Sequence, residues 1–161
     1  MIVVADTTPI ISFAKVKRFD ILEKMFGEIL LPKAVYRELT SNSDYQTEAE
    51  MIQSTPIFKV VEIENESSVS LLRRATGLDL GESEAIVYCD ENSCDLLLVD
   101  EMKARMVAEN MNLNIMGTIG ILKTAYKLGY VSKDELLEIV DVFRKSHRHI
   151  SESLLEELLS I

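Results

Sequence analysis

Short apolar runs recur along this 161-residue chain and restrict its fold more than any other feature. Four runs lie within residues 2–5, 28–31, 95–99 and 113–116, and residues 58–63 hold a weaker fifth. Apolar runs of this length without polar alternation are typical of strands that are buried on both faces of a parallel sheet. Because parallel strands need crossover connections, which are usually helices, we expect strands and helices to alternate along the chain.

Capping residues mark where several of the connecting helices begin. Thr8 can cap a helix whose first residue is Pro9, where the missing N–H of proline costs nothing. Residues 79–82 (DLGE) and 132–135 (SKDE) have the form of capping boxes, and residues 151–159 form a final amphipathic segment. This order of elements predicts an α/β fold, a three-layer α/β/α sandwich with a central, mostly parallel sheet of four to five strands.

The composition favours one globular domain without a membrane span. Apolar residues make up 47% of the chain, and the longest uncharged apolar stretch, residues 110–122, contains three Asn and two Gly. We expect a single domain over residues 1–161, with C-terminal helices from about 132 to 160 packing on it. The first residues lack the basic region of a signal peptide, so we expect a cytoplasmic location. Cys89 and Cys94 have no His or Cys cluster near them, which argues against zinc, and we expect both to be free thiols.

The charges are distributed unevenly along the chain. There are 17 basic and 27 acidic residues, a net charge of −10, which by itself argues against nucleic acid as a partner. Residues 38–66, however, hold seven acids against one Lys, while basic groups occur at 73–74, 103–105 and 144–149. The net charge is therefore a weak argument, and the local distribution must decide.

Two aspartates come directly after predicted strands. Asp6 follows residues 2–5, and Asp100 follows residues 96–99. Because ligands of open α/β sheets bind outside the carboxyl ends of the strands, we expect both side chains at one ligand-binding edge. Either aspartate alone could simply cap the next helix, but Thr8 already supplies a cap after Asp6.

Two glutamates extend this group of acids. Glu82 lies in the first turn of its helix, on the apolar face that continues through Ala85 and Ile86, where an unpaired carboxylate is uncommon. Completing a capping box with Asp79 would also explain Glu82. Glu38 flanks apolar neighbours and can lean toward the edge of the core, although for Glu38 alone a solvated helix position is the better explanation.

Four carboxylates at one edge repel one another unless cations lie between them, so at least one should have a raised pKa in the metal-free protein. We therefore expect Asp6→Asn or Asp100→Asn to stabilise the metal-free protein near neutral pH. Mg²⁺ and Mn²⁺ suit a site made only of carboxylates, because they prefer oxygen ligands. Such ions activate water and offset the charge that develops on a phosphodiester, so the acids indicate metal-assisted phosphate chemistry.

Several segments resemble the motifs of PIN-domain proteins. Residues 3–12 (VVADTTPIIS) look like the first motif, and residues 31–39 (LPKAVYREL) look like the second. Residues 80–86 (LGESEAI), followed by residues 97–100 (LLVD), look like the third and fourth motifs. Residues 117–122 (GTIGIL) are similar to the next strand-to-helix turn in a prokaryotic branch related to VapC-type toxin ribonucleases.

This resemblance implies a Mg²⁺- or Mn²⁺-dependent endoribonuclease that hydrolyses single-stranded RNA. Relatives of this kind are often homodimers and are often paired with a small antitoxin protein. The site residues implied are four metal-binding acids and a hydroxyl that hydrogen-bonds within the site: Asp6, Glu38, Glu82, Asp100 and Thr8. Lys103 and Arg105, one helical turn beyond Asp100, are candidates for contacts to substrate phosphate.

Rival classes fit the sequence less well. A haloacid-dehalogenase-type phosphatase needs a second Asp where Thr8 stands, and the acids and Lys of a receiver domain are missing. No glycine-rich nucleotide loop occurs. His147 and His149 would suit metal-free RNA cleavage, but their basic surroundings favour solvated side chains. The alternative that stays open is a catalytically weak or inactive PIN-like module that acts in binding or assembly.

Overall fold

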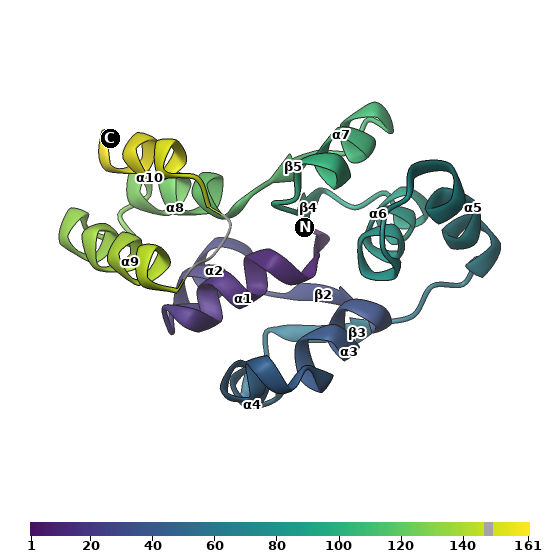
Figure 1. Ribbon diagram of the computed structural model, residues 1–161, viewed down its shortest axis with the longest axis horizontal. Helices are drawn as coiled ribbons and strands as arrows, with labels where there is room; N and C mark the ends of the chain where they lie inside the picture. The colour runs from purple at the N-terminus through teal and green to yellow at the C-terminus, as the bar shows by residue number, and fades with distance from the viewer. Residues whose placement is uncertain (147–149) are drawn as a thin grey trace.

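A parallel sheet forms the centre of the computed structural model, which describes residues 1–146 and 150–161. Within these residues the sheet has five strands, all parallel, in the order β3-β2-β1-β4-β5 (Figure 1). The strands are β1 (Val3–Ala5), β2 (Ile29–Pro32), β3 (Phe58–Val61), β4 (Leu96–Leu98) and β5 (Ile115–Met116). The predicted α/β fold is confirmed, and each strand end lies within two residues of its predicted position.

Helices connect successive strands and cover both faces of the sheet (Figure 1). They are α1 (Thr7–Lys15), α2 (Phe19–Phe26), α3 (Lys33–Ser41), α4 (Gln46–Ser54), α5 (Glu66–Thr76), α6 (Leu80–Asn92), α7 (Met102–Asn110), α8 (Thr118–Lys127), α9 (Lys133–Lys145) and α10 (Glu152–Leu159). A 3₁₀ turn, η1 (Ser43–Tyr45), precedes α4.

The start of α1 differs from the prediction. The helix begins at Thr7, so Asp6 and not Thr8 occupies the N-cap position, with extended backbone angles of φ −82° and ψ 174°. Pro9 is then the third helical residue, which is tolerated because the first N–H groups of any helix lack an intrahelical partner. The Asp6 side chain makes no capping hydrogen bond. Helix capping therefore does not explain why this carboxylate is here.

Both predicted capping boxes are present. The Asp79 side chain accepts from the Glu82 backbone N–H at 2.8 Å, and the Glu82 side chain accepts from the Asp79 N–H at 3.0 Å. Ser132 and Glu135 pair in the same way at the start of α9. These reciprocal bonds satisfy donors that would otherwise be left unpaired, so they fix where each helix begins.

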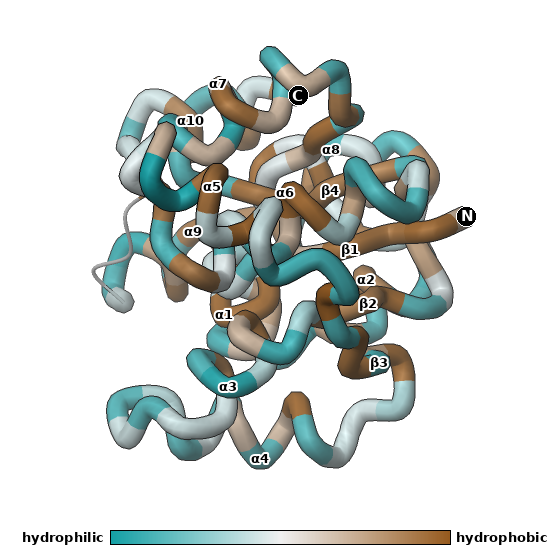
Figure 2. Tube along the Cα trace, turned by 90° about the vertical axis from the view of Figure 1, so that its right-hand side faces the viewer, coloured by the Kyte–Doolittle hydropathy of each residue, from teal (hydrophilic) through white to brown (hydrophobic). Residues whose placement is uncertain are grey.

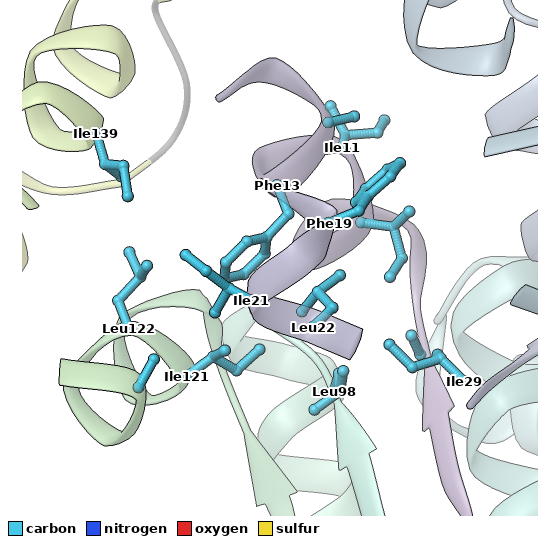
Figure 3. Packing of buried hydrophobic residues seen from close by; sticks show 14 of the residues in the cluster. Ile11, Phe13, Phe19, Ile21, Leu22, Ile29, Leu98, Ile121, Leu122 and Ile139 are labelled. Carbon is cyan, nitrogen blue, oxygen red and sulfur yellow. The ribbon is translucent and has the colours of Figure 1, made fainter. Parts of the chain in front are cut away.

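Alternate residues of the central strands face two separate cores. Val3 and Ala5 of β1 contribute to the larger core, which also contains Phe13, Ile121 and Phe143 from flanking helices (Figure 3 shows part of it). Val4, between them, contributes to a second core with residues of α6 and α7. The central strands are thus buried on both sides, as the apolar runs predicted, whereas the edge strands β3 and β5 are only partly buried. Figure 2 shows β1 as a hydrophobic segment and the outer helix α3 as largely hydrophilic.

The C-terminal helices pack on the larger core. Leu136, Val140 and Phe143 of α9 are buried in it, as are Leu155 and Leu158 of α10. Figure 1 shows α9 and α10 beside α8, at the end of the molecule away from α5 and α6. Among the described residues, no helix is both long and apolar enough to cross a membrane.

The prediction of free thiols is wrong. Cys89 and Cys94 form a disulfide, with their Cα atoms 4.7 Å apart. The reason lies in the end of α6, where Ser93 takes a left-handed conformation with φ 49° and the Cys94 N–H donates to the Cys89 carbonyl at 3.1 Å. This turn folds the chain back on the last helical turn and places the two sulfurs together. His147 and His149, discussed above, lie outside the described residues.

Candidate functional site

Asp6 and Asp100 lie at the same edge of the sheet. Ala5 pairs in register with Leu98, and the Asp6 N–H donates to the Leu98 carbonyl at 2.9 Å. Asp100 follows two residues later on that neighbouring strand. Both aspartates therefore extend from the carboxyl ends of adjacent parallel strands, as predicted.

Asp6 is a buried carboxylate that no cation offsets. Asp6 is only 5% exposed. In the described part of the chain, no Lys or Arg forms a salt bridge with its side chain. The pKa of Asp6 is raised to about 8, chiefly by burial; the Thr7 backbone N–H lowers it, and the nearby carboxylates of Glu82, Asp79 and Glu38 add smaller increases. The expected raised pKa is confirmed, but burial contributes more to it than repulsion does.

Glu38 of α3 is held toward Asp6 by a hydroxyl. Thr7 Oγ1 donates to Glu38 Oε2 at 3.0 Å, which links the first turn of α1 to α3. Glu38 itself is exposed, so it lies at the rim of the group and not beneath it. The Thr7 hydroxyl thus contacts one acid of this group, and the role expected for the neighbouring Thr8 stays a prediction.

Glu82 brings the start of α6 into the same group. Burial raises the pKa of Glu82, the Asp79 backbone N–H lowers it, and the charges of Asp79, Glu101 and Glu38 raise it. Its capping bond to the Asp79 N–H uses Oε2 and leaves Oε1 available. The capping role and a role among the acids are therefore compatible, as the sequence allowed.

Gly81 keeps space open between these acids. A Cβ atom at this position would lie 3.4 Å from Glu38 Oε2 and 3.7 Å from Asp6 Oδ1. It would also lie 3.4 Å from Val35 Cγ2, which walls the space on one side. Oxygens from α3 and from the end of β1 thus face one small volume that a side chain would fill.

Asp100 is held by a different set of partners. Thr118, the first residue of α8, donates its backbone N–H to Asp100 Oδ1 at 2.7 Å and its hydroxyl to Oδ2 at 2.6 Å. Asp100 Oδ1 and Arg105 Nη1 lie 2.8 Å and 2.9 Å from the position that a Cβ at Gly117 would take. Asp100 is therefore anchored to the start of α8, whereas Asp6, Glu38 and Glu82 influence one another directly.

The carboxylate oxygens of the site suit a hard divalent cation chemically, although they do not converge on a single position. No group of three or more His, Cys, Asp or Glu side chains in residues 1–146 and 150–161 is arranged to hold a metal. Glu38, Glu82 and Asp100 each accept a hydrogen bond from the protein, and each carboxylate keeps further lone pairs for a ligand. Oxygen-only donors, a buried Asp6 without a cation and the space at Gly81 together suit Mg²⁺ or Mn²⁺.

Two cationic side chains, Lys103 and Arg105, come from α7, the helix that follows Asp100. Lys103 is exposed on α7 and reaches the loop before α6, where its Nζ lies 3.0 Å from the position of a Cβ at Gly77. Arg105 Nη1 donates to the Val99 carbonyl at 2.9 Å, so part of its guanidinium is already used within the fold. Of the two predicted phosphate contacts, Lys103 is therefore the more available.

Three contributors to the site had no functional prediction from the sequence. Thr7 and Thr118 orient acids, and Gly81 makes room between them. The pairing of Thr118 with Asp100 needs the register of β4 beside β5, which no local pattern reveals. Thr7 was overlooked because the helix was expected to start later.

Fold and site together define an α/β protein with a carboxylate site at the carboxyl edge of a parallel sheet. A family model described as a PIN domain (DUF3368) matches residues 2–161. The chain therefore belongs to the PIN-domain family, whose members are generally nucleases, and the predicted family is confirmed. The branch related to VapC-type toxins stays a prediction. A comparison with curated proteins finds no match.

Proposed function

We propose that this protein is a Mg²⁺- or Mn²⁺-dependent endoribonuclease that hydrolyses single-stranded RNA. The observation that carries the proposal is the buried Asp6, which has no cationic partner among the described residues. Asp6 faces Glu38 across the space at Gly81 and is close enough to Glu82 for the charge of Glu82 to raise its pKa. A fold stabilised only for itself would gain by removing such a carboxyl group, because burial forces it to keep a proton far above its ordinary pKa, which costs free energy of unfolding at neutral pH. Retaining it is understandable if a cation offsets the charge during function.

In this proposal the site residues have different roles. Asp6 and Asp100 would hold the principal ion, and Glu82 and Glu38 would complete its shell or position the attacking water. When bound, Mg²⁺ or Mn²⁺ lowers the pKa of water and offsets charge that develops on the phosphate. Thr7 orients Glu38 and Thr118 orients Asp100, and Lys103 would meet a substrate phosphate.

Cleavage of a fluorescently labelled single-stranded RNA tests the reaction. We expect EDTA to stop cleavage and Mn²⁺ or Mg²⁺ to restore it, with products that carry a 5′-phosphate and a 3′-hydroxyl. Asp6→Asn should reduce the rate at least 100-fold, on the order of the effect of losing one group that stabilises a transition state. Asp90→Asn, which changes an exposed aspartate farther along α6, is the matched control and should keep the wild-type rate.

Metal binding supplies a readout that does not depend on turnover. Calorimetric titration with Mn²⁺ should show binding to the wild type and a loss of at least tenfold in affinity for Gly81→Ala, because the added methyl group fills the space between Glu38 and Asp6. Mn²⁺ binding without cleavage of any RNA or single-stranded DNA would favour the alternative, a PIN-like binding or assembly module. Cleavage that persists in EDTA or in Asp6→Asn would overturn the proposal.

We also propose a homodimer and a small antitoxin partner, on the resemblance to VapC-type proteins alone. Analytical ultracentrifugation of the purified chain tests the first, with a monomer at all concentrations as the contrary result. Co-expression with the product of a neighbouring reading frame tests the second, since an antitoxin should both co-purify and suppress cleavage.

A further inference from the structure

An open cavity of about 500 Å³ lies between α3, α5 and α6, outside the group of acids. Three apolar side chains form part of its wall, namely Ile63, Val69 and Leu80, and Leu80 is 41% exposed there. Its lining also includes three cationic and three carboxylate side chains. Cavities of this size are typical of sites for small organic ligands.

The cavity adjoins the acids through two short stretches of chain. Leu80 lines the cavity and is followed by Gly81, around which Glu38 and Asp6 lie. Arg37 lines it from α3 and directly precedes Glu38. Helices α3 and α5 both contact α6, and Figure 1 shows α5 beside α6. A chain-like substrate that crosses the acids would therefore place its next unit at this cavity.

The lining suits a neutral planar ring better than an anion. Because cations and carboxylates balance, the cavity offers no net positive charge to a phosphate. Apolar walls and planar guanidinium groups are surfaces on which an unpaired nucleobase can stack. Arg37 and Arg73 are exposed at the cavity, where they can meet the phosphates on either side of such a base.

Glu84 gives the cavity a fixed hydrogen-bond acceptor. Its Oε2 accepts from the Ala34 backbone N–H at 3.2 Å, which holds the carboxylate in place and leaves Oε1 available. A carboxylate accepts from an exocyclic amino group, as on cytosine N4, and faces repulsion from a carbonyl oxygen at the same ring position in uracil. Its position in the cavity therefore favours bases that carry an amino group.

We propose that this cavity holds one unpaired nucleobase of the RNA strand next to the acids, and that Glu84 accepts a hydrogen bond from the exocyclic amino group of that base. The inference rests on the proposed ribonuclease function and adds a base preference to it. Base-paired RNA cannot enter in this way, because its bases are stacked within the duplex.

Binding of short RNAs to the full chain carrying Asp6→Asn, which prevents cleavage, tests the inference. Fluorescence anisotropy with eight-nucleotide oligo(C) and oligo(U) compares two strands whose bases differ at the amino position. We expect oligo(C) to bind about tenfold more tightly, the effect of roughly one hydrogen bond to a charged group. Adding Glu84→Gln should bring the two affinities within about twofold, because an amide can both donate and accept.

Two matched controls separate the cavity from the rest of the surface. Glu91→Gln makes the same change at an exposed position two turns farther along α6, outside the cavity, and should leave the tenfold ratio unchanged. Leu80→Ala should weaken both oligonucleotides severalfold, whereas Leu71→Ala, at an exposed leucine of α5 outside the cavity, should weaken neither.

Equal affinity for oligo(C) and oligo(U), unaffected by Glu84→Gln, would overturn the inference, as would equally tight binding of a duplex. Failure to bind either strand would also overturn it and would favour a protein segment as the occupant. Cleavage of RNA without a base preference would sink the cavity proposal alone. A preference for oligo(C) in a protein that cuts no RNA would instead contradict the nuclease proposal and support the inferred base-binding site.

Discussion

At the scale of single residues, the acids of the site differ in what surrounds each carboxylate. Asp6 is buried and has a pKa raised to about 8, whereas Asp100 accepts two hydrogen bonds from Thr118 and has Arg105 nearby. Burial without a partner disfavours the charged form, and donated hydrogen bonds favour it. The two replacements by an amide should therefore change stability in opposite directions: Asp6→Asn should stabilise the metal-free protein, and Asp100→Asn should destabilise it.

We predict that Asp6→Asn stabilises the metal-free protein. The unfolded state loses the Asp6 proton near pH 4, but the folded state keeps it up to about pH 8. The wild-type free energy of unfolding should therefore fall as pH rises through this window and level off above it. Asn does not titrate and avoids this loss. The free energy of unfolding of Asp6→Asn should therefore equal that of the wild type near pH 4 and exceed it by about 2–4 kcal/mol at pH 7. Urea unfolding in EDTA at a series of pH values measures it.

Asp100→Asn is the contrast in the same experiment. Since its carboxylate anchors the start of α8, we expect a loss of about 1 kcal/mol, which revises the stabilisation expected from the sequence. A double-mutant cycle with Thr118→Val should show coupling between the two positions. If the free energy of unfolding depended on pH in the same way in the wild type and in Asp6→Asn, that result would contradict the raised pKa of Asp6.

The sequence identified the acids but not their surroundings. The positions of Asp6 and Asp100 after apolar runs predicted their common edge, because strand ends can be read locally. The hydroxyls of Thr7 and Thr118, which orient Glu38 and Asp100, come from contacts between distant segments that local patterns do not encode. The same limit applies to the cause of the raised pKa, since burial depends on the packing of the whole sheet edge.

At the scale of elements, the turn from β5 into α8 depends on the absence of a side chain at Gly117. A Cβ here would lie 2.8 Å from Asp100 Oδ1 and 2.9 Å from Arg105 Nη1, closer than real Cβ contacts allow. We predict that Gly117→Ala displaces the Asp100 carboxylate, lowers the free energy of unfolding by about 1–3 kcal/mol and weakens Mn²⁺ binding. Urea unfolding and calorimetric titration measure the two effects.

Gly120→Ala, one turn farther along α8, is the matched control. Its Cβ would approach only Met116 Cγ, at 3.1 Å, and a flexible methionine can yield. Because alanine favours a helix interior over glycine by about 1 kcal/mol, this variant should be at least as stable as the wild type. Equal stability of the Gly117 and Gly120 variants would count against the close approach at Gly117.

The disulfide at the end of α6 should stabilise the helix without touching the site. It closes a loop between Cys89 and Cys94 only, and loop-closure entropy for so short a loop amounts to about 2 kcal/mol. We predict that dithiothreitol lowers the free energy of unfolding by up to about 2 kcal/mol and leaves Mn²⁺ affinity unchanged, because the acids lie at the other end of α6. Cys94→Ser should be indifferent to dithiothreitol, and a wild type equally indifferent would contradict the bond.

Elements with local signals were predicted best. The capping boxes at residues 79–82 and 132–135 fixed two helix starts, since both partners lie within four residues of each other. The start of α1 was missed because Thr8 and Pro9 formed an equally good local signal, which the packing of Asp6 overrode. The disulfide was missed because it depends on the left-handed turn at Ser93, for which the sequence offers no glycine.

At the scale of the whole molecule, the net charge of −10 does not describe the cavity, where cationic and carboxylate side chains balance. Arg37, Arg73 and Lys103 come from three helices and lie around the acids and the adjoining cavity. Screening limits the reach of the distant acids to about 8–10 Å at ordinary ionic strength, so an RNA strand bound as proposed would be governed by the charges close to it. The net charge of the whole chain and the local charge around the cavity therefore need not match.

We predict that binding of single-stranded RNA weakens with salt, with a shallow slope. Three phosphate contacts at about −0.7 each give a slope near −2 for the logarithm of affinity against the logarithm of salt concentration. Arg73→Ala should reduce this slope by about 0.7, and Lys127→Ala, at an exposed lysine of α8, should leave it unchanged. Anisotropy titrations from 50 to 300 mM salt measure it, and affinity that rises with salt would mean that repulsion dominates.

The central place of β1 in the sheet governs when the site can exist during synthesis. This strand is made early, yet its neighbour β4 follows much later, and the contact between Ile2 and Asp95 joins residues 93 positions apart. A nascent chain therefore cannot bring Asp6 and Asp100 together until most of the protein has left the ribosome. A product of early termination that ends before residue 100 lacks one of the two aspartates, so under the proposed function it cannot assemble the site.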